Sequence, residues 1–569
     1  MRTYKALAVC WSFAALTSMK LVILAFFGAV ASATTLLDRN LVYISPFHDH
    51  PQFGRDTREL HARHLRNGRR QVQAASAFDD EHYPTFYGGD FSNSPFVWNG
   101  GLNFTHSVAS GDPFDTSVLL WTRAVPLTNE TSPGPDQSVP VCVSYKVFTS
   151  PSLSGKPVNS GEAFTSYDVD FTVKVEATGL KADTKYWYFF ADCTNPSSVS
   201  PTGVTRTISH PDTPAHLVNG GKDLTLAVFS CSQYQRGYFN AYGVGAHNTS
   251  ADIFVHLGDY IYESLGNGAG IGRQVLGREL ATIHDYRQRL NQYRTDVSLV
   301  FAHQNAPWIA VWKLAAVRAY HEWMPVRQVA ADDKLRIWRN FQIGKLLDLT
   351  MLDTRQYDRD LTDVYYNTDY VNTIAAYPNR SLMGLDQENW FFNSLSESKY
   401  RGAVWRIVGQ QIVFTQLNES GHFDLDAWDG YRANRQRVLD HLYRGRIDNT
   451  IVLSGDSHAN WVSDLAHPND TSYDPVTGHG AIGVEFAGTA VSSSSSFGTN
   501  IQPAAADKIS DVLVAVNRNL QWSEGSYRGF YTLTINPNTL TATYWAMNST
   551  SSANLDAFVS AKFVVKNGQ

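Results

Sequence analysis

The sequence predicts two folded units, a small β-sandwich followed by a larger α/β domain. The chain has 569 residues, which is more than one domain usually holds. Residues 98–212 contain short runs of alternating apolar and polar residues separated by turn residues, as in sandwich strands. Residues 223–465 instead contain continuous apolar runs between helical segments, which is typical of buried parallel strands. We therefore place the two domains at residues 98–212 and 219–566, after a poorly ordered linker at 34–97.

The composition excludes several classes of protein. A hydrophobic fraction of 43% is too high for a disordered chain. The net charge of -6 gives no general electrostatic reason to bind nucleic acid, so we expect no nucleic-acid-binding module. Four cysteines in a chain of this length exclude a small disulfide-stapled domain. We expect a monomer.

The N-terminus reads as a signal peptide within residues 1–33. Lys20 precedes an unbroken apolar run, and Ala31-Ser32-Ala33 matches a small-residue cleavage site. The run is too short to span a bilayer, and no later segment looks membrane-spanning. We therefore expect a secreted protein, extracellular or in the cell wall. A second apolar stretch at residues 6–16 leaves an uncleaved anchor as the alternative.

Two further features of the sequence are a linker rich in His and Arg and a set of glycosylation sequons. Between residues 48 and 70 the linker is rich in His and Arg, which indicates a solvated segment; metal binding by its histidines or processing at Arg69-Arg70 are alternatives. Together with the signal peptide, Asn-x-Ser/Thr sequons predict N-glycosylation. These sequons lie at Asn103, Asn129, Asn248, Asn379, Asn418, Asn469 and Asn548.

The cysteines can be assigned from the domain map. Cys10 leaves with the signal peptide. Cys142 and Cys193 both fall in or beside strands of the expected sandwich, so we predict that they form a disulfide. Cys231 then remains as a free thiol in the α/β domain.

Polar residues follow several apolar runs of the α/β domain directly. Because ligands bind at the carboxyl ends of strands in open α/β sheets, these residues are candidates for a site. The runs and the residues after them are LTLAVFS with Cys231, DIFVHL with Asp259 and Tyr262, LLDLTML with Asp353 and Arg355, and TIVLS with Asp456 and His458. A serine-rich loop of low complexity follows at Ser492 to Ser496.

These side chains are of the types that bind metal ions. A carboxylate can bridge two cations, thiolate and phenolate suit ferric iron, and carboxylates suit calcium. Two clustered metal ions can stabilise in-line attack on a phosphoryl group. Each residue alone has an ordinary structural explanation, such as a buried cysteine, a core tyrosine or a turn. Their occurrence together at several strand ends favours a metal site.

The same motifs resemble the PhoD-like alkaline phosphatases, a branch of the metallophosphoesterase superfamily. SVASGDPFDTSVLLWTR resembles the opening of that family's Ig-like N-terminal domain, and FSCSQ, HLGDYIYE, DYRQRL, YHEWMPVR, MLDTRQYD, GQQ, DAWDGY and SGDSHANW resemble its phosphatase motifs in order. The resemblance implies a two-sheet metallophosphoesterase domain built from βαβαβ units, with one ferric iron and calcium ions in the site. It implies that Cys231 and Tyr262 bind iron, that Asp259 bridges iron and calcium, and that Asp456 and His458 complete the shells. Arg355, with Asp353 beside it, is the candidate for contact with the phosphate, although an ion pair would explain Arg355 equally well.

One family motif is missing from the sequence. Ala306 to Trp312 matches the family strand that opens the WDDHE motif, but the following residues, from Lys313 to Pro325, already match the downstream helix. The Asp-Asp-His-Glu ligands of the second metal site are therefore absent, and His321-Glu322 belongs to the helix motif and does not replace them. A block lost from the transcript or gene description and a real isoform both explain this junction.

We therefore predict a secreted metal-dependent phosphatase or phosphodiesterase whose activity in this chain is weak or absent. The alternative is an inactive cell-surface binding or structural protein on a degenerate phosphatase fold. Cysteine-based phosphatase chemistry lacks its arginine, because Cys231 plus six is Gly237. An oxidoreductase has no support, since no C-x-x-C motif occurs.

Overall fold

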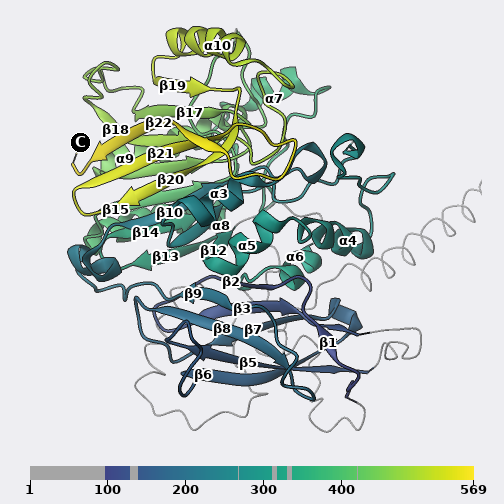
Figure 1. Ribbon diagram of the computed structural model, residues 1–569. Helices are drawn as coiled ribbons and strands as arrows, with labels where there is room; N and C mark the ends of the chain where they lie inside the picture. The colour runs from purple at the N-terminus through teal and green to yellow at the C-terminus, as the bar shows by residue number, and fades with distance from the viewer. Residues whose placement is uncertain are drawn as a thin grey trace, which may run out of the picture.

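The computed structural model describes residues 97–127, 139–266, 268–310, 317–329, 336–419 and 421–568. The predicted signal peptide and nearly all of the predicted linker lie outside these residues. Two large sheets are stacked in the upper part of the molecule, and one of them continues downward into the N-terminal strands (Figure 1). No helix within the described ranges is long and apolar enough to cross a membrane.

A nine-stranded sheet contains strands from both predicted domains. Its three parallel strands from the larger domain, β10, β11 and β12, are flanked by the C-terminal strands on one side and by N-terminal strands on the other. In sheet order the strands are β22 (Ala557–Lys566), β21 (Thr539–Met547), β20 (Arg528–Ile535), β10 (Leu224–Phe229), β11 (Ile253–His256), β12 (Pro307–Ala310), β2 (Val108–Gly111), β3 (Val118–Arg123) and β7 (Thr172–Ala177).

A seven-stranded sheet packs against the first. Strands β14, β15, β16 and β18 run parallel, and antiparallel strands complete both edges. In sheet order the strands are β13 (Arg339–Ile343), β14 (Leu347–Met351), β15 (Trp405–Gln410), β16 (Thr450–Ser454), β18 (Ala481–Ala487), β17 (Asn460–Ala466) and β19 (Leu520–Glu524). This pair of sheets gives the predicted α/β architecture.

The N-terminal strands form a sandwich that is not self-contained. One of its layers is the four-stranded sheet β6 (Asn159–Thr165), β5 (Val141–Phe148), β8 (Lys185–Asp192) and β9 (Gly203–Arg206). The other layer, β2, β3 and β7, continues the nine-stranded sheet, because β12 pairs in parallel with β2 at Trp308 and Gly111. The sequence pattern did not predict this continuity. Two short strands, β1 (Leu102–Asn103) and β4 (Val125–Pro126), pair beside it.

Buried ion pairs join the N-terminal strands to the larger domain. Arg339 lies 2.7 Å from Asp112, and Arg327 lies 2.6 Å from Glu176, with all four side chains almost fully buried. Removing one partner of such a pair leaves an uncompensated buried charge, which costs about 3–5 kcal/mol. The described parts of the two domains are therefore packed as one body.

Helices cover the outer faces of the two sheets. In the described part of the chain the α-helices are α3 (Asn240–Asn248), α4 (Ile283–Tyr293), α5 (Val297–Asn305), α6 (Val317–Trp323), α7 (Thr368–Ile374), α8 (Gly384–Tyr400), α9 (Arg432–Gly445) and α10 (Pro503–Val516). Short 3₁₀ helices occur at Tyr167–Val169, Ala215–Gly221, Tyr234–Arg236, Ala269–Ile271 and Trp428–Tyr431. The start of α4 is fixed by a reciprocal capping box between Thr282 and Asp285.

The core follows the alternation of the strands. In β16, Ile451 and Leu453 join the central core, whereas Val452 packs into the cluster under α8 and α9. Both sets are fully or almost fully buried, because successive side chains of a strand point to opposite faces and both faces are covered. This explains the continuous apolar runs in the sequence.

The described cysteines have the predicted states. Cys142 and Cys193 form a disulfide, and Cys231 is free and buried. Among the predicted glycosylation sites, Asn103, Asn248, Asn379, Asn469 and Asn548 are exposed and Asn418 is half-buried. Asn129 lies outside the described residues, and glycosylation stays a prediction.

Candidate metal centre

Loops after strands of both sheets meet at one place. Cys231 follows β10, Asp259 follows β11, and His458 follows β16. One ligand atom from each of these three side chains lies within 4.8 Å of the other two. The first two residues come from the nine-stranded sheet and the third from the seven-stranded sheet. The structure therefore brings together three of the five predicted metal ligands.

Tyr262 is also part of this cluster. Its hydroxyl donates a hydrogen bond to Nε2 of His458 at 3.1 Å. On the other side of the imidazole, Nδ1 donates to the backbone carbonyl of Ser494 at 2.8 Å. A carbonyl can only accept, so this bond places the ring proton on Nδ1 and leaves the Nε2 lone pair facing the cluster. The orientation is that of a metal-binding histidine.

The two sheets can approach closely because residue 455 is glycine. A Cβ atom at Gly455 would lie 3.3 Å from the Cβ atoms of Ser230 and Leu257 and from the carbonyl oxygen of Gln411. These neighbours belong to the loops after β10, β11 and β15. Gly455 therefore allows the loop of Asp456 and His458 to lie against the loops of Cys231 and Asp259.

Four of the predicted ligands have left-handed backbone conformations. The φ angles are +62° at Cys231, +50° at Asp259, +67° at Asp456 and +52° at His458. A non-glycine residue in this region costs about 1–3 kcal/mol and persists only where its surroundings hold it. Such conformations cluster at functional sites, and here they occur where sharp turns direct side chains inward from the strand ends.

Burial favours the neutral forms of the thiol, the phenol and the imidazole of the cluster. Burial, together with the carboxylates of Asp259 and Asp456, raises the pKa of the Cys231 thiol. Burial also raises the pKa of the Tyr262 phenol well above its usual value and lowers the pKa of the His458 imidazole. A bound cation would reverse this preference for the thiol and the phenol, so metal binding would release protons from them.

Asp456 makes a different contact from the other ligands. One of its carboxylate oxygens forms an ion pair with Nη2 of Arg355, which is almost fully buried. The Nη1 of Arg355 lies 2.5 Å from Asp426, and Asp426 in turn lies 2.9 Å from Arg359. Asp456 thus begins a chain of alternating carboxylates and guanidinium groups. Asp426 and Arg359 were not predicted from the sequence, although the DAWDGY and LDTRQYD motifs contain or border them.

Asp353 has a structural explanation. Its Oδ1 accepts hydrogen bonds from the backbone N–H groups of Arg355 and Gln356, each at 3.0 Å. The carboxylate therefore shapes the turn that carries Arg355. A catalytic role for Asp353 stays a prediction that these contacts do not require.

Comparison with known proteins identifies the family. The family "PhoD-like phosphatase" matches residues 226–313 and 313–544, and "PhoD-like phosphatase, N-terminal domain" matches residues 95–209. Alkaline phosphatase D of Bacillus subtilis (strain 168) is 32% identical over 534 aligned positions, and the match covers 88% of this chain and 84% of the relative. The chain belongs to the PhoD-like phosphatase family.

Solved structures agree with this membership of the PhoD-like family. The structure of PhoD matches with a TM-score of 0.70 and 31% identity, covering 82% of this chain and 91% of that one. A purple acid phosphatase from yellow lupin (Lupinus luteus) seeds matches with a TM-score of 0.50 and 11% identity, covering 82% and 74%. The second likeness shows a shared fold alone.

The PhoD-like family pattern is interrupted at the predicted junction. The two matched segments of the phosphatase domain meet at residue 313, next to the Trp312–Lys313 junction. Downstream, Glu322 of α6 lies 2.7 Å from both Arg287 and Arg318. These two ion pairs account for the Glu322 carboxylate.

The serine-rich loop completes the cluster of this PhoD-like chain. Besides the carbonyl of Ser494, the Oγ of Ser493 donates to the carbonyl of Cys231 at 3.1 Å. Arg528 donates from Nη1 to the carbonyls of His458 and Ser493, at 3.1 and 2.7 Å. The sequence indicated only a low-complexity loop here, because backbone carbonyls have no signature in a sequence.

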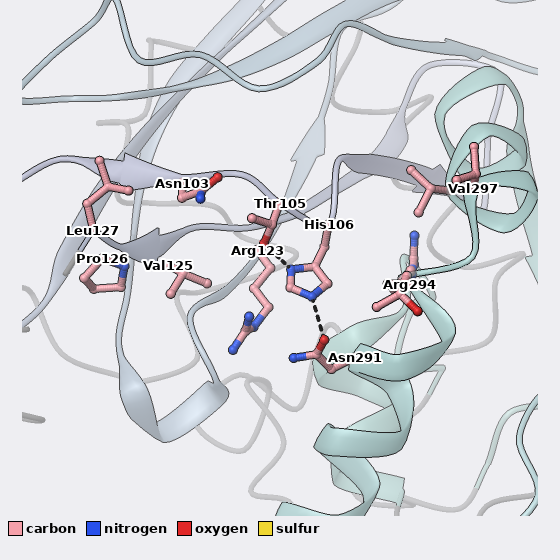
Figure 2. Close-up of a pocket in the computed structure, with 12 residues that line it drawn as sticks. Asn103, Thr105, His106, Arg123, Val125, Pro126, Leu127, Asn291, Arg294 and Val297 are labelled. Atoms are coloured by element: carbon pink, nitrogen blue, oxygen red, sulfur yellow. Dashed lines mark hydrogen bonds between the residues drawn. The ribbon is translucent and has the colours of Figure 1, made fainter. Parts of the chain in front are cut away.

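A cavity of about 690 Å³ lies elsewhere, between the N-terminal strands and the end of α4 (Figure 2). His106 at its centre donates from Nε2 to Oδ1 of Asn291 at 3.1 Å, and burial lowers the pKa of His106 to about 4. Arg123 on its wall is paired with Asp170. None of the predicted metal ligands or catalytic residues lines this cavity, whereas the predicted glycosylation site Asn103 does, so the cavity is separate from the candidate metal centre.

Proposed function

We propose that this chain is a secreted phosphatase or phosphodiesterase that hydrolyses phosphate esters at a metal centre. The observation that carries the proposal is the meeting of Cys231, Asp259 and His458 within 4.8 Å, with the Tyr262 hydroxyl beside His458. The family membership supports the reaction class. The predicted signal peptide supports secretion, and the disulfide agrees with an oxidising compartment.

The donor set of the centre fits ferric iron. A thiolate, a phenolate, a carboxylate and an imidazole are together suited to a first-row transition metal of high charge. We propose that Cys231, Tyr262, Asp259 and His458 hold this ion. When bound, the ion would polarise the phosphoryl group of the ester. The protein supplies the orientation, through the bond from His458 to Ser494 and through the strained turns.

Calcium is the second cofactor that the family resemblance implies, and the described residues fit it less well. Calcium takes six to eight oxygen ligands, whereas the predicted metal ligands of this cluster include only two carboxylates, those of Asp259 and Asp456. Asp456 is already paired with Arg355. We therefore propose that calcium is held weakly and that hydrolysis by this chain is slower than by an intact relative. Loss of a single electrostatic group commonly lowers the rate by about 10²–10³-fold.

Turnover of p-nitrophenyl phosphate and bis-p-nitrophenyl phosphate, with iron and calcium present, tests the activity. We expect slow, metal-dependent release of nitrophenol that Cys231→Ser abolishes. Alkaline phosphatase D of Bacillus subtilis provides the benchmark. Turnover equal to that benchmark would refute the impairment, and turnover that survives in Cys231→Ser would refute the metal centre.

An inactive binding or structural protein at the cell surface is the second candidate. The observation that favours it is the interruption of the family match at residue 313. Metal analysis of the purified chain separates the two candidates. Absence of both iron and calcium after loading would favour the binding protein, whereas a bound iron ion would favour the enzyme.

A further inference from the structure

The cavity beside the end of α4 lies where the N-terminal strands meet the larger domain. Its volume of about 690 Å³ is within the range of pockets that hold small molecules. One wall comes from β1, β3, β4 and the connection between β1 and β2, and the other wall comes from the end of α4 and from α5. A molecule bound here would touch both parts of the protein and would not occupy the metal centre.

The lining of this cavity has an excess of positive charge. Arg123 and Arg294 line it, and no Asp or Glu is among the described residues that do. Arg123 is paired with Asp170 at 2.6 Å, whereas Arg294 has no carboxylate partner in the described part of the chain. The Arg294 guanidinium lies over Trp121, its Nη2 donates to the Trp323 carbonyl at 3.4 Å, and its Nη1 has no acceptor among the described residues. Because only 3% of Arg294 is exposed, water compensates its charge poorly, and a bound anion would stabilise it.

His106 fixes the orientation of a second donor, the side-chain amide of Asn291. The amide oxygen can only accept, so Nε2 of His106 donates to it at 3.1 Å, and Nδ1 then accepts from the Thr105 hydroxyl at 3.0 Å. Nδ2 of Asn291 is left as a donor without an acceptor among the described residues, and Figure 2 shows it on the side of Arg123. Nη1 of Arg123 is free in the same sense, because Nε and Nη2 both donate to Asp170. The cavity therefore offers hydrogen-bond donors together with positive charge, which is what an oxyanion requires.

The rim of the cavity is apolar and accessible. Val125, Pro126 and Leu127 line it on the side of the N-terminal strands, and Val297 and Val300 line it on the side of α5. Leu127 is 45% exposed and Val297 is 80% exposed, so both have apolar surface that a ligand could cover. The rim therefore suits a ligand whose charged group is attached to an apolar body.

We propose that this cavity binds a small organic molecule through an oxyanion group, a phosphate or a carboxylate. The oxyanion accepts hydrogen bonds from Asn291 and Arg123 and balances the charge of Arg294, while the apolar body of the molecule packs against the valines of the rim. Because Arg123 belongs to β3 and Asn291 to α4, the ligand links the N-terminal strands to the larger domain. This site is independent of the proposed metal centre and of the reaction proposed for it.

Calorimetric titration of the full chain tests the proposal. The probes are phenylphosphonate, which resembles a phosphate ester but is not hydrolysed, benzoate, and inorganic phosphate, which has no apolar body. We expect saturable binding of one molecule per chain, with inorganic phosphate the weakest of the probes. Tighter binding of phenylphosphonate would identify the group as a phosphate, and tighter binding of benzoate would identify it as a carboxylate. Cys231→Ser, which removes a proposed metal ligand, should bind the probes as the unmodified chain does; loss of binding in this variant would place the anion at the metal centre and overturn the proposal.

Variants of the cavity locate the binding site. Arg294→Met removes the uncompensated charge and keeps an apolar contact with Trp121, so the affinity should fall by at least about tenfold. Asn291→Asp keeps the acceptor for His106 but puts a negative charge into the cavity, so it should lose binding even if Arg294→Met fails to fold. Arg444→Met, at an exposed ion pair on the surface, changes the net charge as much as Arg294→Met does and should bind normally. Absence of saturable binding of every probe, or equal affinity in all folded variants, would overturn the proposal.

Discussion

The imidazole of His458 donates from Nδ1 to the backbone carbonyl of Ser494 at 2.8 Å, and its Nε2 accepts from Tyr262 at 3.1 Å. One bond fixes the tautomer and the other lies within the metal cluster. Ser494 belongs to a loop that contributes no ligand side chain of its own. The loop thus contacts the proposed metal centre through backbone atoms, and its attachment to the rest of the protein should matter for metal binding.

Arg528 is the side chain that ties this loop to the ligand loop, through the carbonyls of His458 and Ser493. We expect Arg528→Met to weaken iron binding by about 10–100-fold, which is the usual effect of removing a group that orients metal ligands. Equilibrium titration with iron measures it. Arg518→Met is the matched control, because Arg518 donates to the carbonyl of Tyr473, in another part of the protein. Equal affinities in the two variants would contradict the role given to Arg528.

Iron binding should strengthen as the pH rises. Burial raises the pKa values of the Cys231 thiol and the Tyr262 phenol, so both groups are protonated at neutral pH and must lose a proton to the solvent when the metal binds. Each released proton makes the apparent affinity about tenfold stronger per pH unit. Calorimetry in buffers of different ionisation enthalpy counts the protons released. Cys231→Ser should release fewer and lose most of the affinity; unchanged proton release would show that the thiol does not bind.

His256 should make the fold sensitive to acid. Its Nδ1 accepts from the Gly258 N–H at 3.3 Å and its Nε2 lies 2.9 Å from the Tyr242 hydroxyl, in a fully buried site. Burial lowers its pKa from the usual 6.5 to about 3. The unfolded chain therefore takes up a proton that the folded chain excludes. This contribution to stability is complete above pH 6.5 and is lost as the pH falls towards 3, at about 1.4 kcal/mol per pH unit.

Urea unfolding at several pH values between about 4 and 7 measures how the unfolding free energy depends on pH. In His256→Gln, the slope of unfolding free energy against pH should decrease by the contribution of one proton, about 1.4 kcal/mol per pH unit. If His256→Gln keeps the original slope, His256 does not cause the acid sensitivity.

The disulfide should stabilise the N-terminal sheet without affecting the metal centre. Cys142 lies in β5 and Cys193 follows β8, and the bond closes a separation of 51 residues. The double variant Cys142→Ala/Cys193→Ala should lose about 2–4 kcal/mol of unfolding free energy, because the unfolded chain gains conformational freedom. Iron content should stay the same, since Cys231 is not involved. Loss of iron in this variant would show that the two regions are coupled.

The sequence was sufficient for features that depend on neighbouring residues. The continuous apolar run before Cys231 is a local pattern that burial of both strand faces explains. The alternating run around Cys142 is a local pattern that burial of one face explains. The polar residues after the strands could be proposed as ligands because their position directly after an apolar run is also a local property of the sequence. The disulfide followed from placing Cys142 and Cys193 in the same small domain.

Other features depend on contacts between distant segments. The sequence does not encode locally that β12 pairs with β2, since that pairing joins residues nearly two hundred positions apart. It also does not show that Ser494 supplies a carbonyl to His458, because every residue type has a backbone carbonyl. The pairing of Arg355 with Asp456 likewise had an equal alternative, contact with the phosphate.

By itself, the sequence determined which side chains stand at the strand ends, because strand periodicity and turn residues are local properties of the chain. Only the tertiary structure decided that Cys231 and Asp259 meet His458 across two sheets, and that Arg355 faces Asp456. The packing of the two sheets at Gly455 brings these groups together, and it depends on side chains from both sheets at once.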